Sequence, residues 1–129
     1  MSTNLNDIIN SSQYFNDLIQ AFPDLREKVE NEDGVHSKME CFADYTIEQI
    51  KKVDLNELKK CFEFQDVKIP ICPELENAMT VSYCESLLLG EVGGIMEDFL
   101  KYMKPKLLKM YLDYANYYYG LIDGKDRDN

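Results

Sequence analysis

Apolar residues recur every three or four positions along most of the chain, and this spacing constrains the fold more than any other feature. One such stripe consists of Met39, Phe42, Ala43, Ile47 and Ile50, which share one side of a helix. Related stripes occupy residues 4–22, 55–67, 74–89, 95–103 and 107–121. No segment alternates with the period of two that is typical of a half-buried strand. The pattern predicts an all-α fold of five or six helices, packed as antiparallel hairpins in a bundle or a short solenoid-like array.

The ends of these helices are marked by capping and breaking residues. Pro23 ends the first stripe, and Asp54 followed by Glu57 resembles a capping box. Pro73 suits the first position of a helix, and Gly90 suits the position just after its end. A chain of 129 residues is long enough to bury one core of ordinary size. We therefore expect a single helical domain over residues 1–122 and a polar tail over residues 123–129.

The chain is strongly acidic, with 24 Asp and Glu against 14 Lys and Arg, a formal net charge of −10. Residues 1–50 carry ten acidic and three basic residues, which gives −7, whereas residues 51–129 carry fourteen and eleven, which gives −3. This balance argues against a nucleic-acid partner, because phosphate binding needs a basic face. No apolar run reaches the length of a membrane span, and no signal-peptide pattern is visible. We expect a cytoplasmic protein that binds neither nucleic acid nor membrane.

The residues that usually carry chemistry form no known motif. Four cysteines at positions 41, 61, 72 and 84 contain no CxxC pair, so reduced thiols near the core are expected rather than a zinc site. His36 is the only histidine, and no nucleophile or metal-ligand pattern accompanies it. The glycine-rich run 90–94 lacks the spacing of a phosphate-binding loop. The sequence predicts a protein that is not an enzyme and that holds neither a metal nor a cofactor.

Tyrosines are concentrated near the C-terminus, where six of the nine lie between positions 102 and 119. On a helix, Tyr111, Tyr114 and Tyr118 share one face. Each buried tyrosine hydroxyl needs a hydrogen-bond partner, so we do not expect all of them to be buried. Two interpretations stay open: the rings cover the edge of the core, or they form a binding interface.

Acidic side chains form a second candidate surface. Glu40, Asp44 and Glu48 are spaced by four residues, which places them along one stripe of a helix opposite its apolar side. Glu30, Glu32 and Asp33 lie in and beside the turn that precedes this helix. The six carboxylates are either an ordinary solvated surface or a face that meets a basic partner.

Three segments carry a resemblance to a known kind of protein. They are Met39-x-x-Phe42-Ala43, the stretch Asp54-Leu55-x-x-Leu58-Lys59-Lys60-Cys61-Phe62, and Glu74-Leu75-Glu76-Asn77-Ala78-x-x-Val81-Ser82-Tyr83-x-Glu85-x-Leu87. Together they cover about residues 35–90 and resemble small, acidic, all-helical bacterial domains of unknown function, some of which are similar to immunity proteins of polymorphic toxin systems. The resemblance implies a helical adaptor or inhibitor that works by binding, and it carries no catalytic residues.

These features lead to three functional hypotheses. The first is a non-catalytic module that binds another protein, such as an immunity-type inhibitor whose acidic residues occupy the basic surface of a toxin. The second is a small-molecule-binding domain or enzyme with a pocket lined by Tyr111, Tyr114, Tyr118 and Cys84. The third is a homo-oligomeric structural protein, at its simplest a homodimer, that uses the tyrosine-rich helix as its interface.

Overall fold

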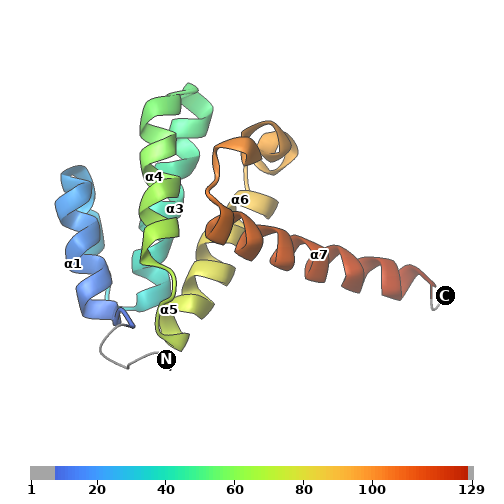
Figure 1. Cartoon of the computed structure of the whole chain (residues 1–129), viewed down its shortest axis with the longest axis horizontal. Helices are drawn as coiled ribbons and strands as arrows, with labels where there is room; N and C mark the ends of the chain where they lie inside the picture. The colour runs from blue at the N-terminus through green and yellow to red at the C-terminus, as the bar shows by residue number, and fades with distance from the viewer. Residues whose placement is uncertain (1–7, 128–129) are drawn as a thin grey trace.

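The computed structural model describes residues 8–127 of the chain, with side chains as far as Leu121, and this part is almost entirely helical (Figure 1). The elements in chain order are α1 (Ser11–Ala21), η2 (Pro23–Leu25), α2 (Arg26–Glu30), α3 (Val35–Lys52), α4 (Leu55–Lys68), α5 (Pro73–Ala78), η3 (Met79–Cys84), α6 (Glu85–Leu89), η4 (Gly93–Tyr102) and α7 (Pro105–Arg127). The β-pairing within the described residues is limited to one isolated bridge between Ile9 and Ile71. The predicted all-α class is confirmed.

Residues 8–127 form seven α-helices where five or six helices were predicted. The difference arises mainly in the central helix, which the apolar stripe predicted as one element over residues 74–89. Its middle turn, η3, has the wider hydrogen-bond pattern of a π-helix, so α5 and α6 are separate elements on either side of it. Backbone angles stay helical at both junctions, Ala78 and Glu85, so the three pieces follow one another without a break. Apolar spacing does not reveal such a local change in hydrogen bonding.

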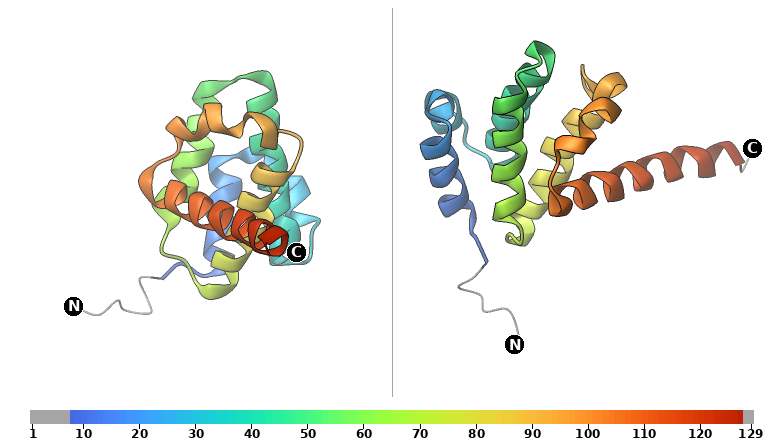
Figure 2. Two further views of the ribbon diagram at one scale, coloured as in Figure 1. Left: turned by 90° about the vertical axis from the view of Figure 1, so that its right-hand side faces the viewer. Right: turned by 45° about the horizontal axis from the view of Figure 1, so that its top comes forward.

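Helices α3 and α4 form the predicted antiparallel hairpin and lie side by side at the centre of the molecule (Figures 1 and 2). The connection is only two residues long, because Val53 adopts a left-handed conformation with φ of 56° that ends α3 at once. Asp54 then caps α4, and its Oδ1 accepts a hydrogen bond from the Glu57 backbone N–H at 3.2 Å. The capping role predicted for Asp54 is confirmed.

Aromatic side chains from α3, α4, η3 and the residue before η2 meet in the core. Phe42 of α3 is fully buried, and its ring centroid lies 5.1 Å from that of Phe22, 5.7 Å from that of Phe64 and 5.3 Å from that of Tyr83. Two of the rings are tilted and one is edge-on, which are favourable aromatic geometries. The cluster therefore joins the chain before η2 to α3, α4 and η3.

The turn between α6 and η4 depends on glycine. A Cβ atom on Gly93 would lie 2.2 Å from the Leu88 carbonyl oxygen, and one on Gly90 would lie 2.4 Å from that of Ser86. Both contacts are far below van der Waals distance, so the chain can turn this tightly only without side chains here. The glycine-rich run is thus a joint between helices.

The last helix, α7, is attached at its N-terminal end to the end of α4. Asp66 Oδ1 accepts hydrogen bonds from the backbone N–H groups of Lys106 at 2.8 Å and Leu107 at 3.0 Å, so a residue of α4 caps α7. Lys106 Nζ also donates to the Ile69 carbonyl oxygen at 3.2 Å. These contacts fix the point at which α7 leaves the rest of the molecule.

From this attachment, α7 projects away from the other helices, as Figures 1 and 2 show from three directions. Its first half packs on the other helices through Leu107, Tyr111 and Ala115, all of which are buried. Between residues 116 and 121 every residue except Tyr118 is exposed. The helix extends to Arg127, beyond the expected end near residue 121, so it includes most of the expected tail, of which residues 128–129 lie outside the described part. No helix within residues 8–127 is both long and apolar enough to cross a membrane.

Candidate functional site

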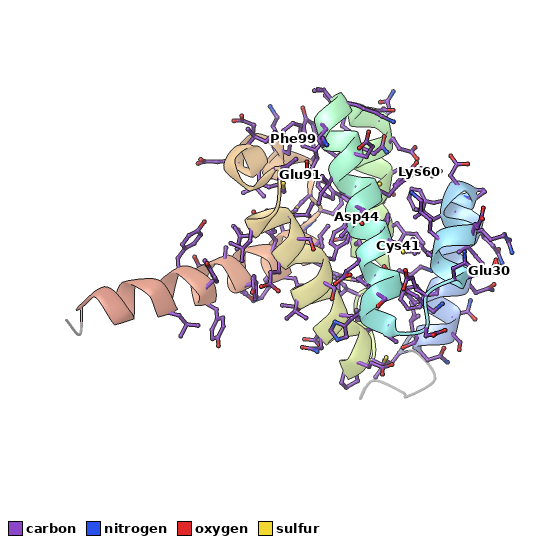
Figure 3. The ribbon with its side chains drawn as sticks, turned by 180° about the vertical axis from the view of Figure 1, so that it is seen from behind. Glu30, Cys41, Asp44, Lys60, Glu91 and Phe99 are labelled. Carbon is purple, nitrogen blue, oxygen red and sulfur yellow. The ribbon has the colours of Figure 1, made fainter. Side chains whose placement is uncertain are left out.

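The six predicted acidic residues, here called the acidic face, all lie exposed on α2, α3 and the loop between them. Glu40, Asp44 and Glu48 follow one stripe of α3, as their spacing predicted. Glu30 ends α2, and Glu32 and Asp33 lie in the loop. Figure 3 shows Asp44 on α3 beside Cys41, with Glu30 beyond them on the neighbouring segment. The structure therefore brings acids from two elements onto one side of the molecule.

The pKa of the half-buried Cys41 thiol reflects the negative charge of this face. Burial raises the pKa of this thiol, and the nearby carboxylates of Glu32 and Asp44 raise it further, while Lys28 acts in the opposite direction. Glu32 comes from the loop and Asp44 from the middle of α3, so both act on one atom although twelve residues separate them. A thiol in such surroundings stays protonated and is a poor nucleophile. The negative field is thus a property of the folded face.

Few of the charges on the acidic face are neutralised within the chain. Arg26 pairs with Glu30 at 3.6 Å, and Lys52 pairs with Glu48 at 3.8 Å, in both cases between half-exposed side chains one helical turn apart. Such exposed pairs are weak and screened by salt. The other four carboxylates form no ion pair with any Lys or Arg side chain that the structure describes. The face therefore keeps most of its negative charge.

A hollow of about 290 Å³ lies between η2–α2 and α3 on the same side. Its lining includes Lys28, Cys41, Asp44 and Glu48, together with Tyr45. The Tyr45 hydroxyl donates a hydrogen bond to Glu57 of α4, and burial raises the pKa of Tyr45. The hydroxyl is thus engaged in holding α3 and α4 together, and the hollow is bordered by two carboxylates, Asp44 and Glu48, and one ammonium group, Lys28.

The three predicted tyrosines of α7 occupy different environments. Tyr111 is 3% exposed, and burial raises its pKa to about 12. Tyr114 and Tyr118 are half-buried. Cys84, the fourth residue of the expected pocket, is fully buried in η3. Tyr111 and Cys84 therefore belong to the core, and only Tyr114 lines the surface hollow described next.

An open groove of about 590 Å³, here called the α7 groove, runs between the central helix and α7. It is lined by Glu76, Thr80, Val81, Lys106, Lys109, Met110, Asp113, Tyr114 and Tyr117. Two carboxylates and two ammonium groups border it, and Lys109 and Asp113 form an ion pair at 2.7 Å. The groove is therefore close to electrically neutral, unlike the acidic face.

Residues 15–119 match the family described as a domain of unknown function, DUF7674. The chain belongs to this family. No curated protein and no solved structure matches the chain. The matched segment includes α2, α3 and the acidic face, and it follows α7 as far as Tyr119. Both surfaces therefore lie within the segment that defines the family.

The sole histidine, His36, forms contacts that join two helices. His36 Nδ1 lies 2.7 Å from Ser82 Oγ, and Asn77 Nδ2 lies 3.3 Å from His36 Nε2. Ser82 is 4% exposed, and these contacts join the start of α3 to the central helix. Within the described residues, no group of three or more His, Cys, Asp or Glu side chains could hold a metal ion.

Sequence reasoning missed two features of these surfaces. Tyr117 lines the α7 groove, yet its helical position places it outside the face of Tyr111, Tyr114 and Tyr118. The spacing of Tyr117 three residues after Tyr114 and four before Leu121 could have drawn attention to it. The six carboxylates were predicted as one candidate surface, but nothing in the sequence indicated that Glu32 and Asp44 both lie near Cys41, because the path of a loop is set by the helices it joins.

Proposed function

We propose that this protein is a non-catalytic module that binds another protein, and that its acidic face meets a basic surface of that partner. The observation that carries the proposal is the concentration of six exposed carboxylates on α2, α3 and their loop, of which two have weak ion pairs. Complementary charge speeds encounter and orients the two proteins before they touch.

The cost of the acidic stripe supports a role for it. Like charges four residues apart on a helix repel and destabilise it by a few tenths of a kcal/mol per pair. Glu40, Asp44 and Glu48 form two such pairs in succession, and Lys52 offsets only the last of the three. A basic partner would remove this repulsion, and the free energy recovered would favour the complex.

The resemblance to immunity proteins suggests one kind of partner. A bacterial toxin with a basic active site would be blocked if the acidic face occupied that site, through steric exclusion and charge neutralisation. We place this inhibitor in the cytoplasm, because its four cysteines are free thiols, as expected in a reducing compartment.

A matched pair of variants tests the proposal. Glu40→Gln/Asp44→Asn/Glu48→Gln removes three charges from the acidic face, and Glu63→Gln/Glu97→Gln/Asp98→Asn removes three exposed charges from α4 and η4. Both variants and the unmodified chain serve as baits in an extract of the source organism, and captured proteins are quantified.

A partner held by the unmodified chain and by the α4–η4 variant, but lost from the acidic-face variant and weakened by salt, would support the proposal. The same partners on all three baits would contradict it, since the acidic face would then contribute nothing. If such a partner has a measurable activity, inhibition by the unmodified chain and not by the acidic-face variant supports the inhibitor role.

A further inference from the structure

The outer half of α7, residues 116–127, exposes apolar side chains at Tyr117, Tyr119 and Leu121 that nothing in the described chain covers. Leu107, Met110, Tyr114, Tyr117 and Leu121 are spaced by three, four, three and four residues, which is the repeat of a coiled-coil seam. We call these five residues the α7 seam. Leu107 is fully buried, Met110 and Tyr114 are half-buried, and Tyr117 and Leu121 are 63% and 52% exposed. The seam thus begins in the core and continues into solvent.

This exposure is concentrated on one element. Of eight large apolar side chains exposed in the described part of the chain, four lie within residues 112–121: Leu112, Tyr117, Tyr119 and Leu121. The same stretch has a weak tendency to form a helix alone, because it contains three consecutive tyrosines and Gly120. An outer half of this composition needs packing against another surface to stay helical.

Charge favours a second copy of this chain as that surface. Two molecules with a net charge of −10 repel each other, so they can associate only where the local charge is small. Residues 105–127 carry four basic and three acidic residues, a local charge of +1. The α7 groove is bordered by two residues of each sign, Glu76 and Asp113 with Lys106 and Lys109. A hollow with balanced charge of this kind can receive the same helix from a second copy without net repulsion.

The direction of pairing follows from the same argument. If two α7 helices ran parallel, the two acidic molecules would be crowded together at one end. In an antiparallel pair they lie at opposite ends of a helix pair about 35 Å long. The outer half of each α7 then enters the α7 groove of the other copy. Its carbonyl end, which carries partial negative charge, approaches Lys106 and Lys109.

We propose that two copies of this chain form a two-fold symmetric dimer through antiparallel α7 helices, with the outer half of each filling the α7 groove of the other. The register pairs Met110 with Leu121 of the second copy and Tyr114 with Tyr117, so every exposed seam residue has an apolar partner. An interface of this kind is self-complementary, as two-fold symmetry requires. The dimer uses α7 and leaves the acidic face free. Failure of the dimer proposal would therefore not affect the proposed function, and the reverse also holds.

Sedimentation velocity tests the dimer. We expect the unmodified chain to form a dimer as its concentration is raised to about 100 µM, because even weak dimers are populated at the upper end of this range. Tyr117→Lys/Leu121→Lys should be monomeric at the same concentrations, because two buried charges would replace two apolar contacts. Val53→Lys/Val67→Lys is the matched control, since both valines are 61% exposed and belong neither to the α7 seam nor to the lining of the α7 groove. This control should remain dimeric, and circular dichroism should show that both variants are folded.

The proposal is overturned if the unmodified chain is a monomer throughout this range. It is also overturned if the Tyr117→Lys/Leu121→Lys variant still forms the dimer, since the seam would then not be the interface.

A cross-linking experiment tests the register. Met110→Cys and Leu121→Cys chains, mixed and oxidised by air with a copper catalyst, should form a disulfide between the two copies. Each variant alone should give only the background of the native cysteines. Equivalent positions 110 and 110 lie about 16 Å apart along the pair, beyond the reach of a disulfide. Cross-linking that is as strong in either single variant as in the mixture would overturn the antiparallel register.

Discussion

The tyrosines of the helical body, which we define as α1 to α6, η4 and the first half of α7, contrast with those of the outer half of α7. Tyr14 and Tyr83 are fully buried, whereas Tyr117 and Tyr119 are 63% and 51% exposed. Both buried hydroxyls have a hydrogen-bond partner on another helix: Tyr14 donates to Gln65 of α4, and Tyr83 lies 2.8 Å from Thr46 of α3. Thr46 gives its own proton to the Phe42 carbonyl, so Tyr83 is the donor to Thr46.

The contrast shows what burial of a tyrosine requires. A ring adds apolar area, yet its hydroxyl must find a partner when water is removed. Within the body, neighbouring helices supply Gln65 and Thr46 at the right places. The outer half of α7 has no neighbouring helix in the described chain, so its rings remain in water until another molecule covers them.

The sharpest test of this contrast compares one aromatic residue from each region. Phe42→Ala should lower the free energy of unfolding by about 3–5 kcal/mol, because it leaves a cavity at the centre of the aromatic cluster. Tyr117→Ala should change it by less than about 0.5 kcal/mol. Urea unfolding followed by circular dichroism, at a protein concentration low enough to keep the chain monomeric, measures both. Similar losses for the two variants would remove the distinction between the regions.

Alkaline pH provides a second test of the body. Burial raises the pKa of the Cys61 and Cys84 thiols to about 12, above the value of 9.0 for an exposed thiol. The folded state therefore holds these protons longer than the unfolded state, and the stabilisation is complete below pH 9 and is lost as the pH rises toward 12. Between pH 8 and pH 10 we expect a loss of roughly 3 kcal/mol from the two thiols.

Urea unfolding at a series of pH values measures this loss. Above pH 9, the slope of the free energy of unfolding against pH should be smaller in Cys84→Ala by the contribution of about one proton. This holds whatever the effect of the substitution on stability at neutral pH. A slope that is unchanged in this variant would show that Cys84 is not responsible.

The attachment of α7 can be weakened without touching its apolar residues. Asp66→Ala should lower the free energy of unfolding by about 1 kcal/mol, because the N–H groups of Lys106 and Leu107 lose their acceptor. Hydrogen exchange at these two amides should become faster than at amides of α3. Asp66→Asn is the matched control, since it keeps the oxygen acceptor and should lose less. Equal protection of both amides in all three chains would exclude the capping role.

The smallest expected effect concerns single hydroxyl groups. Tyr83→Phe should cost about 1 kcal/mol, because it removes the donor to Thr46 in the core. Tyr119→Phe should leave the free energy of unfolding unchanged within about 0.5 kcal/mol, because the side chain is 51% exposed and no hydrogen bond within the described chain is lost. A cost for Tyr119→Phe that equals the cost for Tyr83→Phe would contradict the difference between the two environments.

Several parts of the fold follow from local sequence. The stripe of α3, the cap at Asp54 and the start of the central helix at Pro73 are present as predicted, because each depends on residues within one turn. The π-helical middle of the central helix was not predictable, since its side chains have ordinary helical spacing. The cap that Asp66 provides for α7 also has no local signal, because about forty residues separate the donors from the acceptor.

The candidate surfaces, like the fold, were predictable only where they depend on local sequence. The sequence alone determined that the chain is helical, that its acidity lies mainly in the first fifty residues and that Glu40, Asp44 and Glu48 form one stripe. The period of 3.6 residues sets which side chains share a face, so no tertiary contact is needed for that conclusion. Only the tertiary structure decided that Glu32 joins the stripe at Cys41, that Tyr111 is core, and that the outer half of α7 projects with its seam uncovered. The reason is physical: a helix fixes the direction of each side chain, but burial depends on what another element places opposite it.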